Sequence, residues 1–439
     1  MKKKYRIILY TSIFLLCVVA SIILVVKKSN SVYEEESKPK VVKHKSMLSM
    51  NLEQTAGSGD YKTVTQSSWP TEGYKFNAEL SKCENGSTLS WDDTKKAVIM
   101  QGNVSDKCYV YFDIWIPSIA DYCTSGTDLA TCVKNFGDQG PSVSNIYIHN
   151  SSLTNGAGDN SYRYAGANPN NFVCFGSDAS PCPIDNLYRI IGVFGENYHG
   201  ANGKQLVKLI KYDYMTTDEL GTDGDYSQTY KEWGMDSTYK GTYGDGERIG
   251  VYYWNYKATG SATNTWSTSL LNKTNLNTNF INNIGTTWAN KIATVTWKVG
   301  GNTWANIGTK TSSVAYTNEI TNPVTTNTTD NATTYSAKIG LMYVSDYGFA
   351  ASPDAWTLTM SSYNNTTATN NNWMYMGLYE WTISRIADNS DSAFTVNDVG
   401  DVDDDGVGYN GGVRASFNLE SSVSYVSGSG SMSDPIVIN

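Results

Sequence analysis

An acidic segment between residues 387 and 411 contains the side chains best suited to bind a ligand. It reads ADNSDSAFTVNDVGDVDDDGVGYNG, with seven Asp and no Lys, Arg or Glu. Asp401, Asp403 and Asp405, followed by a Gly, have the spacing with which a calcium-binding loop begins, where alternate carboxylates converge on a hard cation. Such loops carry a bidentate Glu at the twelfth position, where this chain has Gly412. The segment therefore matches the calcium-loop motif only in part, and calcium is a candidate ligand. The sequence predicts no other cofactor.

The same segment is also a candidate recognition surface. Asn, Asp, Ser and Tyr side chains make adaptable polar contacts, and a loop whose two ends are fixed by strands can vary without unfolding the protein. The segment therefore predicts a binding site for an extracellular protein or glycan. The candidate ligand-binding residues are Asp388, Asn389, Asp391, Asn397, Asp398, Asp404, Tyr409 and Asn410. A solvated loop without a ligand is the competing interpretation.

An aromatic run just before this segment is a second place where a sugar could bind. Residues 373–381 read WMYMGLYEW, and aromatic rings present flat apolar faces. Runs of this kind more often belong to the core and rim of a sheet. Exposure of Trp373 and Tyr375 would favour stacking on a sugar, whereas burial would favour the core.

Side chains for nucleophilic or acid/base catalysis are scarce. The chain has three His and no Gly-x-Ser-x-Gly sequence of the kind that places a nucleophilic Ser on a sharp turn. Glycoside hydrolysis needs two carboxylates at a defined separation, which a sequence does not reveal. We therefore predict no catalytic residues and no enzymatic activity, with a hydrolase as the weakest alternative.

Six cysteines after residue 50 predict disulfide bonds. An even number of cysteines is typical of an exported protein, and six allow fifteen connectivities. Short loops favour pairing of neighbours in the sequence. The predicted pairs are Cys83–Cys108, Cys123–Cys132 and Cys174–Cys182. A zinc site is not expected, because no two cysteines form a Cys-x-x-Cys pair.

The first 47 residues predict a membrane anchor and a stalk. Residues 7–26 contain no charge and are long enough to cross a bilayer as a helix. Four basic residues precede them, which favours a cytoplasmic N-terminus and an extracellular body. The sequence thus predicts a single-pass cell-membrane protein with a cytoplasmic tip and transmembrane anchor over 1–28 and a polar stalk linker over 29–47. A cleavable signal peptide is the alternative for this region.

Two regions follow the stalk. Residues 48–116 predict a small β-rich domain, because two β-prone runs flank a polar turn between 88 and 100 and residues 108–113 alternate like a further strand. Residues 117–161 predict a connector of helix and loop, with a short helix at 127–134.

Residues 162–439 predict an α+β domain. Because strands come first and last, with helices between them, the two ends can share a sheet. The expected elements are strands at 186–194 and 204–212, helices at 267–273 and 276–292, and strands at 337–344, 381–385, 412–419 and 435–438.

The charges of the chain are distributed unevenly. Residues 1–50 hold ten Lys and Arg against three Glu, and the remainder holds 23 basic against 39 acidic residues. Nucleic-acid binding needs clustered Lys and Arg. The acidic body therefore predicts no nucleic-acid partner.

Several segments resemble a large group of uncharacterised bacterial cell-surface proteins. They are NLYRIIGVF and KQLVKLI, KIGLMYVSDYGFA at 338–350, EWTISR at 380–385, and GVRASFNLESSV near the end. Residues 380–420 also resemble the end of the C-type-lectin-like fold found in formylglycine-generating enzymes. The resemblance implies a C-type-lectin-like α+β domain over 162–439, with a variable recognition segment at 386–411. The oxidation chemistry of those enzymes uses Cys residues near the end of the fold, and this chain has no Cys after Cys182.

Together these features predict a membrane-anchored, surface-displayed recognition or adhesion protein. Its expected partners are the lipid bilayer, through residues 7–26, and an unknown extracellular protein or glycan. A structural envelope protein without a specific ligand is the alternative.

Overall fold

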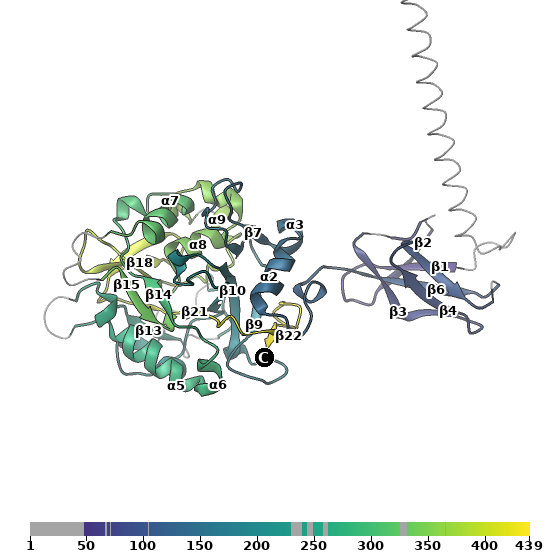
Figure 1. Ribbon diagram of the computed structural model, residues 1–439, viewed down its shortest axis with the longest axis horizontal. Coiled ribbons are helices and arrows are strands. Elements are labelled where there is room, and N and C mark those ends of the chain that lie inside the picture. Colours follow the sequence, from purple (N-terminus) through teal and green to yellow (C-terminus); the bar gives the residue numbers. More distant parts are fainter. Residues whose placement is uncertain are drawn as a thin grey trace, which may run out of the picture. The chain divides into compact units, whose positions relative to one another are not determined.

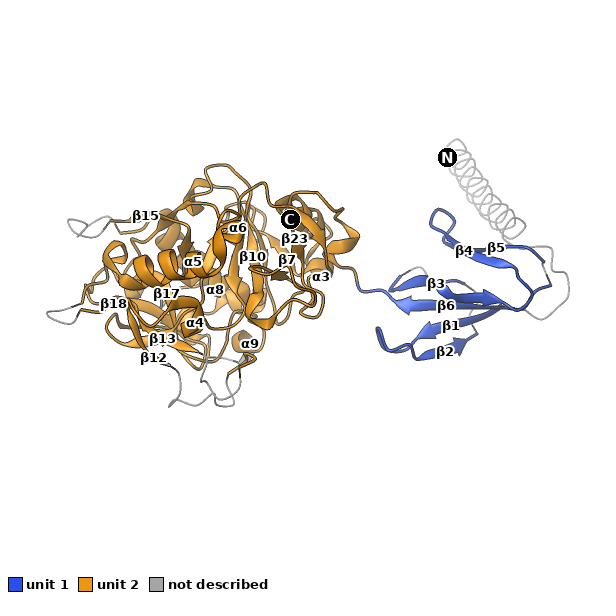
Figure 2. Ribbon diagram, turned by 90° about the horizontal axis from the view of Figure 1, so that it is seen from below, with its two compact units in different colours: residues 1–116 blue, residues 117–439 orange. Residues whose placement is uncertain are grey.

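The computed structural model describes residues 48–439 except 66–67, 71, 104, 230–238, 244–248, 258–261, 325–331 and 365. It has two compact units, one ending at Ile116 and the other beginning at Pro117 (Figure 2). We call them unit 1 and unit 2. Unit 1 ends at Ile116, which is also the last residue of the predicted small β-rich domain. The segment 117–161 belongs to unit 2 and does not stand apart as a connector.

Unit 1 is a four-stranded sheet with an added hairpin (Figure 1). The sheet order is β2-β1-β6-β3, in which β1 and β6 are parallel and the other neighbours antiparallel. In β6, alternate side chains are buried, as expected for a strand with one face on the core. The strands are β1 (Leu48–Glu53), β2 (Tyr61–Val64), β3 (Tyr74–Cys83), β4 (Thr88–Asp92), β5 (Ala97–Gln101) and β6 (Cys108–Ile114). Strands β4 and β5 form the hairpin expected between 88 and 100.

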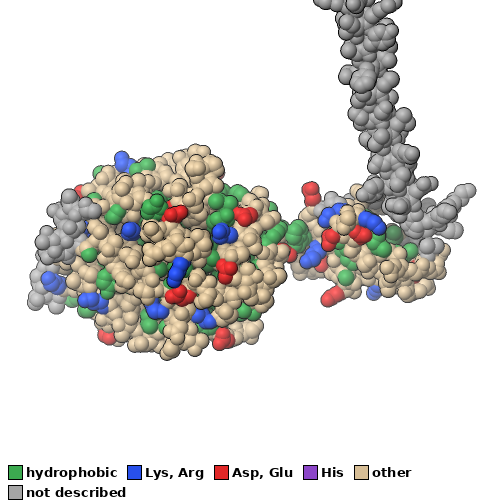
Figure 3. Space-filling model, viewed as in Figure 1, with side chains coloured by type: hydrophobic (Ala, Val, Ile, Leu, Met, Phe, Trp, Pro, Cys, Tyr) green, Lys and Arg blue, Asp and Glu red, His purple; other side chains and the backbone are tan. Residues whose placement is uncertain are grey.

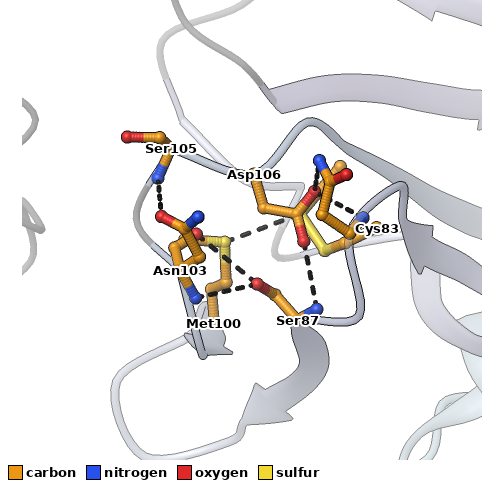
Figure 4. The surroundings of a disulfide bond; sticks show 8 residues. Cys83, Ser87, Met100, Asn103, Ser105 and Asp106 are labelled. Atoms are coloured by element: carbon orange, nitrogen blue, oxygen red, sulfur yellow. Dashed lines mark hydrogen bonds between the residues drawn. A yellow bond between two sulfur atoms is a disulfide. The ribbon is translucent and has the colours of Figure 1, made fainter.

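The core of unit 1 is small and is supported by a disulfide. Phe112 is at its centre and contacts the rings of Trp69, Phe76 and Trp91. The Cys83–Cys108 bridge joins β3 to β6 where these strands pair. Beside it, the buried carboxylate of Asp106 accepts a hydrogen bond of 3.0 Å from the main-chain N–H of Ser87 (Figure 4). Ser87 Oγ in turn accepts one from the N–H of Asn103. The bridge and these bonds hold the loops at this end of the sheet.

Unit 2 is built on two larger sheets. The central sheet has the order β16-β21-β11-β10-β8-β7, with β9 also paired to β10. Every residue of β10 and β11 is buried, so these strands are covered on both faces. The second sheet has the order β12-β13-β20-β17-β18-β19, and two strand pairs complete the unit.

The strands of unit 2 lie as follows. The central sheet contains β7 (Ile146–Ile148), β8 (Tyr162–Tyr164), β9 (Phe172–Cys174), β10 (Leu187–Phe194), β11 (Leu206–Lys211), β16 (Ile339–Gly340) and β21 (Ser416–Asn418). The second sheet contains β12 (Tyr226–Thr229), β13 (Gly250–Tyr253), β17 (Glu380–Arg385), β18 (Ser392–Val396), β19 (Val402–Gly406) and β20 (Asn410–Gly412). The separate pairs are β14 (Val295–Lys298) with β15 (Thr334–Ala337), and β22 (Tyr425–Ser427) with β23 (Val437–Ile438).

The helices of unit 2 are short. The α-helices are α2 (Leu129–Gly137), α3 (Pro141–Ser144), α4 (Thr217–Leu220), α5 (Ile281–Asn283), α6 (Gly285–Ala289), α7 (Ser312–Tyr316), α8 (Val344–Ala350) and α9 (Thr366–Thr369). The 3₁₀ segments are η1 (Ile119–Asp121), η2 (Ile184–Asn186), η3 (Asn197–His199), η4 (Trp266–Thr268), η6 (Trp304–Asn306), η8 (Pro353–Thr357) and η9 (Met360–Ser362). The π-helices are η5 (Leu271–Phe280) and η7 (Thr317–Thr321).

The fold class predicted from the sequence is wrong. Strand accounts for 32% of the structure and helix for 22%, spread over several sheets, so the protein is β-rich and is not the C-type-lectin-like α+β protein expected. The predicted helix at 276–292 is present in shorter pieces, η5, α5 and α6. It is divided at Gly285, whose φ of +77° is a left-handed conformation that interrupts a right-handed helix.

The predicted single-pass membrane topology is also corrected. Across the part of the chain that the structure describes, no helix is both long enough and apolar enough to cross a bilayer. The predicted anchor over 7–26 and the stalk over 29–47 lie outside the described residues. A single-pass cell-membrane localisation therefore has no structural support.

The predicted disulfide bonding is confirmed. Cys123–Cys132 ties α2 to the chain before it, and Cys174–Cys182 ties the end of β9 to the next loop. Asp128 caps the start of helix α2, and its carboxylate accepts a hydrogen bond of 2.8 Å from the N–H of Thr131. All six cysteines after residue 50 are paired with their neighbours in the sequence.

The face of unit 2 that Figure 3 shows is predominantly uncharged. On the face shown in Figure 3, Lys, Arg, Asp and Glu side chains are scattered among uncharged polar groups and backbone. The acidic excess is therefore not visible as one patch on this face.

Candidate ligand-binding pocket

The acidic segment 386–411, which the sequence predicted to be one loop, contains the two paired strands β18 and β19 and the start of β20. Strands β18 and β19 form an antiparallel hairpin in which Phe394 lies opposite Asp404. All five residues of β18 are buried, which commits this part of the segment to the sheet. Strand β19 ends the order of the second sheet and is thus an edge strand. Charged residues are typical of edge strands, because they oppose pairing with another chain.

The predicted ligand residues lie at opposite ends of this hairpin. Asp388, Asn389 and Asp391 belong to the turn before β18, and Asn397 and Asp398 belong to the turn after it. A five-residue strand is about 17 Å long. The residues therefore do not form one site.

Several of the predicted residues hold the hairpin together. Asn397 is 8% exposed, and its Oδ1 accepts a hydrogen bond of 2.9 Å from the N–H of Asp401. Asn389 Nδ2 donates to Ser392 Oγ, and Asn410 Nδ2 donates to Ser227 Oγ. The amides of Asn397, Asn389 and Asn410 are thus used for structure. Tyr409 is 65% exposed, and Asp404 lies exposed in β19.

Of the three candidate calcium ligands, Asp403 and Asp405 lie in β19 and Asp401 lies just before it. Asp401 Oδ1 accepts a hydrogen bond of 2.7 Å from the N–H of Asn364. Asp403 and Asp405 are alternate residues of an extended strand, about 7 Å apart along the chain. Burial, followed by the charge of Asp403, raises the pKa of Asp405. Among the described residues, no group of three or more His, Cys, Asp or Glu is arranged to hold a metal ion, and calcium stays a prediction.

A cavity of about 330 Å³ lies beside the hairpin. Its walls come from β9 and the loop before it, β10, the residue after β11, the loop before β17 and the C-terminal segment, with Lys240 as a further part. Four asparagines line it, Asn168, Asn170, Asn370 and Asn372. Four aromatic side chains line it as well, Phe172, Tyr212, Trp373 and Tyr375. The pocket was not predicted from the sequence. Two of its residues, Trp373 and Tyr375, belong to the aromatic run at 373–381.

Trp373 and Tyr375 form the rigid floor of the pocket. They are 3% and 6% exposed. Trp373 Nε1 donates a hydrogen bond of 2.9 Å to the carbonyl oxygen of Tyr164. Tyr375 OH donates one to the carbonyl oxygen of Asp398, at the tip of the hairpin. The aromatic run is therefore mostly core, and the hairpin supports the pocket through Tyr375.

Asn372 fixes the loop that carries these aromatic residues. Its Nδ2 donates a hydrogen bond of 3.0 Å to the carbonyl oxygen of Tyr347, and its Oδ1 accepts one of 2.9 Å from the N–H of Met374. The other three lining asparagines are exposed at the rim. The pocket thus combines a fixed apolar floor with amides that can reach a ligand.

Arg189 is the most deeply placed charge of the pocket. It is 5% exposed and lies between the rings of Phe172 and Trp373, at 4.4 and 4.6 Å. Its Nε donates a hydrogen bond of 2.7 Å to Asn171 Oδ1, and its Nη2 donates one of 2.9 Å to the carbonyl oxygen of Pro169. Burial lowers the pKa of Arg189 to about 9, so the guanidinium is charged at neutral pH. In the sequence, Arg189 could have been recognised as the one charged residue within the otherwise apolar run LYRIIGVF.

Lys240 supplies a second positive charge at the rim. Its Nζ donates a hydrogen bond of 3.0 Å to the carbonyl oxygen of Thr369 and lies 4.3 Å from the centre of the Tyr375 ring. Partial burial lowers the pKa of Lys240.

A second group of charges is enclosed in the core of unit 2. Arg163 Nη2 lies 2.8 Å from Asp159 Oδ2, and Lys208 Nζ lies 2.5 Å from Asp346 Oδ2. His199 Nε2 lies 2.9 Å from Asp159 Oδ2. Burial opposes ionisation of Asp346, but the charges of Lys208 and Arg163 outweigh it and hold the pKa of Asp346 below its usual value. This cluster joins β8, β11 and α8 and does not line the pocket.

Comparison with known proteins gives no relative from which a function could be transferred, so the functional argument is based on the geometry of the pocket. No protein-family model matches the chain, and neither curated proteins nor solved structures give a match.

Proposed function

We propose that the protein is a recognition protein that binds a small polar ligand, of the size and chemistry of a sugar ring, in the pocket between β9, β10 and the loop before β17. The observation that carries the proposal is the cavity itself. Its volume of about 330 Å³ falls in the range of small-molecule sites, and its lining combines aromatic rings with a few polar groups.

The chemistry of the lining suits a sugar. Exposed amides of Asn168, Asn170 and Asn370 can donate to and accept from hydroxyl groups. The edges of the aromatic rings supply apolar contact for the carbon skeleton. Adaptable polar contacts over a rigid aromatic base are also typical of evolved recognition surfaces.

The same lining favours binding over catalysis. Its thirteen residues, all in the described part of the chain, include no Asp, Glu, His, Cys, Ser or Thr. Glycoside hydrolysis requires a pair of carboxylates at the bond that breaks. We therefore expect a bound sugar to be released unchanged.

A glycan array followed by calorimetry on the full chain tests the proposal. We expect saturable binding, and Asn170→Ala or Asn370→Ala should each weaken it roughly fivefold, because a hydrogen bond is worth about 1 kcal/mol. Tyr409→Ala, at the far end of the hairpin, is the matched control and should leave the affinity unchanged.

Two results would contradict the proposal. Binding that is lost in Tyr409→Ala and retained in the pocket variants would place the site on the hairpin. An array without any bound glycan would favour a structural protein with no ligand of this class. Chromatography of the recovered ligand separates binding from hydrolysis.

A further inference from the structure

The charge of the pocket is opposite to that of the chain around it. Two cationic side chains, Arg189 and Lys240, are among its thirteen lining residues, and none of these residues is acidic. After residue 50 the chain has 39 acidic against 23 basic residues. A lining with two cations and no carboxylate therefore reverses the balance of the surrounding protein.

Four other buried cations of unit 2 are each paired with a carboxylate. Pairs of this kind are formed by Arg163 with Asp159, Lys208 with Asp346, Lys211 with Glu219, and Arg414 with Glu380. Among the residues that the structure describes, Arg189 has only neutral acceptors, which are Asn171 Oδ1 and two main-chain carbonyl oxygens. In the same described part of the chain Arg385 also has no carboxylate partner, but it does not line this pocket. A buried charge without a counter-charge is costly in free energy.

Arg189 retains donors that an anion can use. A guanidinium has five N–H groups in a planar fork. Three are used in the bonds to Asn171, Pro169 and Trp373, so within the described part of the chain one donor on Nη1 and one on Nη2 remain. Two such donors match the two oxygens of a carboxylate or phosphate. Phe172 and Trp373 hold the guanidinium in place from both sides.

Lys240 completes the electrostatic arrangement. Its ammonium has three donors, of which one is used by the carbonyl oxygen of Thr369. Because it lines the same cavity as Arg189, it adds to the positive potential there.

We propose that the ligand of this pocket is an anionic sugar, whose carboxylate or phosphate is bound by Arg189 and Lys240 while its ring lies against the aromatic floor. This inference rests on the proposed function, since it names the chemical class of the ligand for the same pocket. Carboxylate and phosphate share the required chemistry, which is two or more oxygens bearing a negative charge.

Matched pairs of ligands test the inference by calorimetry on the full chain. The pairs are glucuronate with glucose, galacturonate with galactose, and glucose 6-phosphate with glucose, each at low and at physiological salt. We expect the charged member of at least one pair to bind tenfold or more tightly, with a preference that shrinks as salt rises. A preference confined to glucose 6-phosphate identifies phosphate as the anion, and one confined to the uronates identifies carboxylate.

Substitution of Lys240 tests whether the preference for charged over neutral ligands arises in the pocket. Lys240→Gln should reduce the charged-over-neutral preference about fivefold to tenfold, and Lys240→Arg should restore most of it. Lys204→Gln removes the same charge from an exposed position outside the lining and serves as the control. Arg189→Lys should abolish the preference. Arg189 is buried, so Arg189→Lys could fail to fold. Lys240 is exposed, so its variants test the inference even in that case.

The outcomes separate this inference from the proposed function. Equal binding of glucose and glucuronate, or an unchanged preference in Lys240→Gln, overturns the anionic ligand and leaves sugar binding intact. Inorganic phosphate that binds as tightly as glucose 6-phosphate keeps the anion and overturns the sugar ring. No binding of any probe overturns both.

Discussion

Lys208 shows how a charged side chain is accommodated in the interior of unit 2, by pairing with a buried carboxylate. Its ammonium is 2% exposed and contacts Asp346, which also lies near Arg163. In the chain these three residues are far apart, and each stands in a segment that looks apolar or loop-like. No local pattern connects them, so the cluster could not be predicted from the sequence.

Replacing Lys208 should be strongly destabilising. Lys208→Met keeps most of the volume but leaves Asp346 with less positive charge around it. Breaking a buried ion pair on one side costs about 3 to 5 kcal/mol, and we expect a loss of this size in chemical denaturation of unit 2. Lys204→Met, at an exposed position, should change stability by less than about 0.5 kcal/mol. A loss below about 1 kcal/mol in Lys208→Met would show that water or a rearranged partner compensates.

Among the elements, β19 combines an exposed position with a concentration of charge. It carries Asp403, Asp404 and Asp405 and ends the order of its sheet. Partial loss of hydration raises the pKa of Asp404, and the charges of Asp403, Asp405 and Asp388 raise it further. Two copies of this edge would repel each other.

Neutralising β19 should therefore promote association of the protein. We expect the triple variant Asp403→Thr, Asp404→Thr and Asp405→Thr to form dimers or larger species as concentration rises, because an edge strand without charge can pair with another. Sedimentation velocity over a concentration series is the measurement. A control with the same charge change, Asp60→Thr, Asp178→Thr and Asp354→Thr, should stay monodisperse. Equal association of both variants would attribute the effect to net charge alone.

The elements differ in how far the sequence could predict them. Strands β10 and β11 were predicted because two apolar runs flank a Gly- and Asn-containing turn. The hairpin β18–β19 was missed because Asp is a poor strand former and suggested a loop. Its strand signal was the run SAFTV, whose residues are all buried.

The pocket was missed for a different reason. Its walls come from six separate parts of the sequence, including Phe172, Lys240 and Met432. Pairing of β9 with β10 and the packing of later loops bring these parts together. A tertiary arrangement of this kind has no local periodicity to reveal it.

For the whole molecule, the division into two units predicts two separate unfolding transitions. The Cys83–Cys108 bridge spans 25 residues within unit 1, and the Cys174–Cys182 bridge spans 8 within unit 2. From loop entropy, removing the first should cost about 3.5 kcal/mol and removing the second about 2.5 kcal/mol.

Calorimetry of two double variants checks this expectation. Cys83→Ala with Cys108→Ala should lower the transition of unit 1 and leave that of unit 2 in place, because the core of unit 1 is thin. Cys174→Ala with Cys182→Ala should have the converse effect. A shift of both transitions in either variant would show that the units unfold together.

The position of β21 in the central sheet also determines when unit 2 can finish folding during synthesis. This strand, at Ser416–Asn418, lies between β16 and β11. On the ribosome β11 therefore emerges long before its neighbour and presents an unpaired edge until β21 has been synthesised. Unit 1, whose strands all lie before Ile116, can fold as soon as it emerges. We expect chaperones that bind nascent chains to protect the second unit far more than the first.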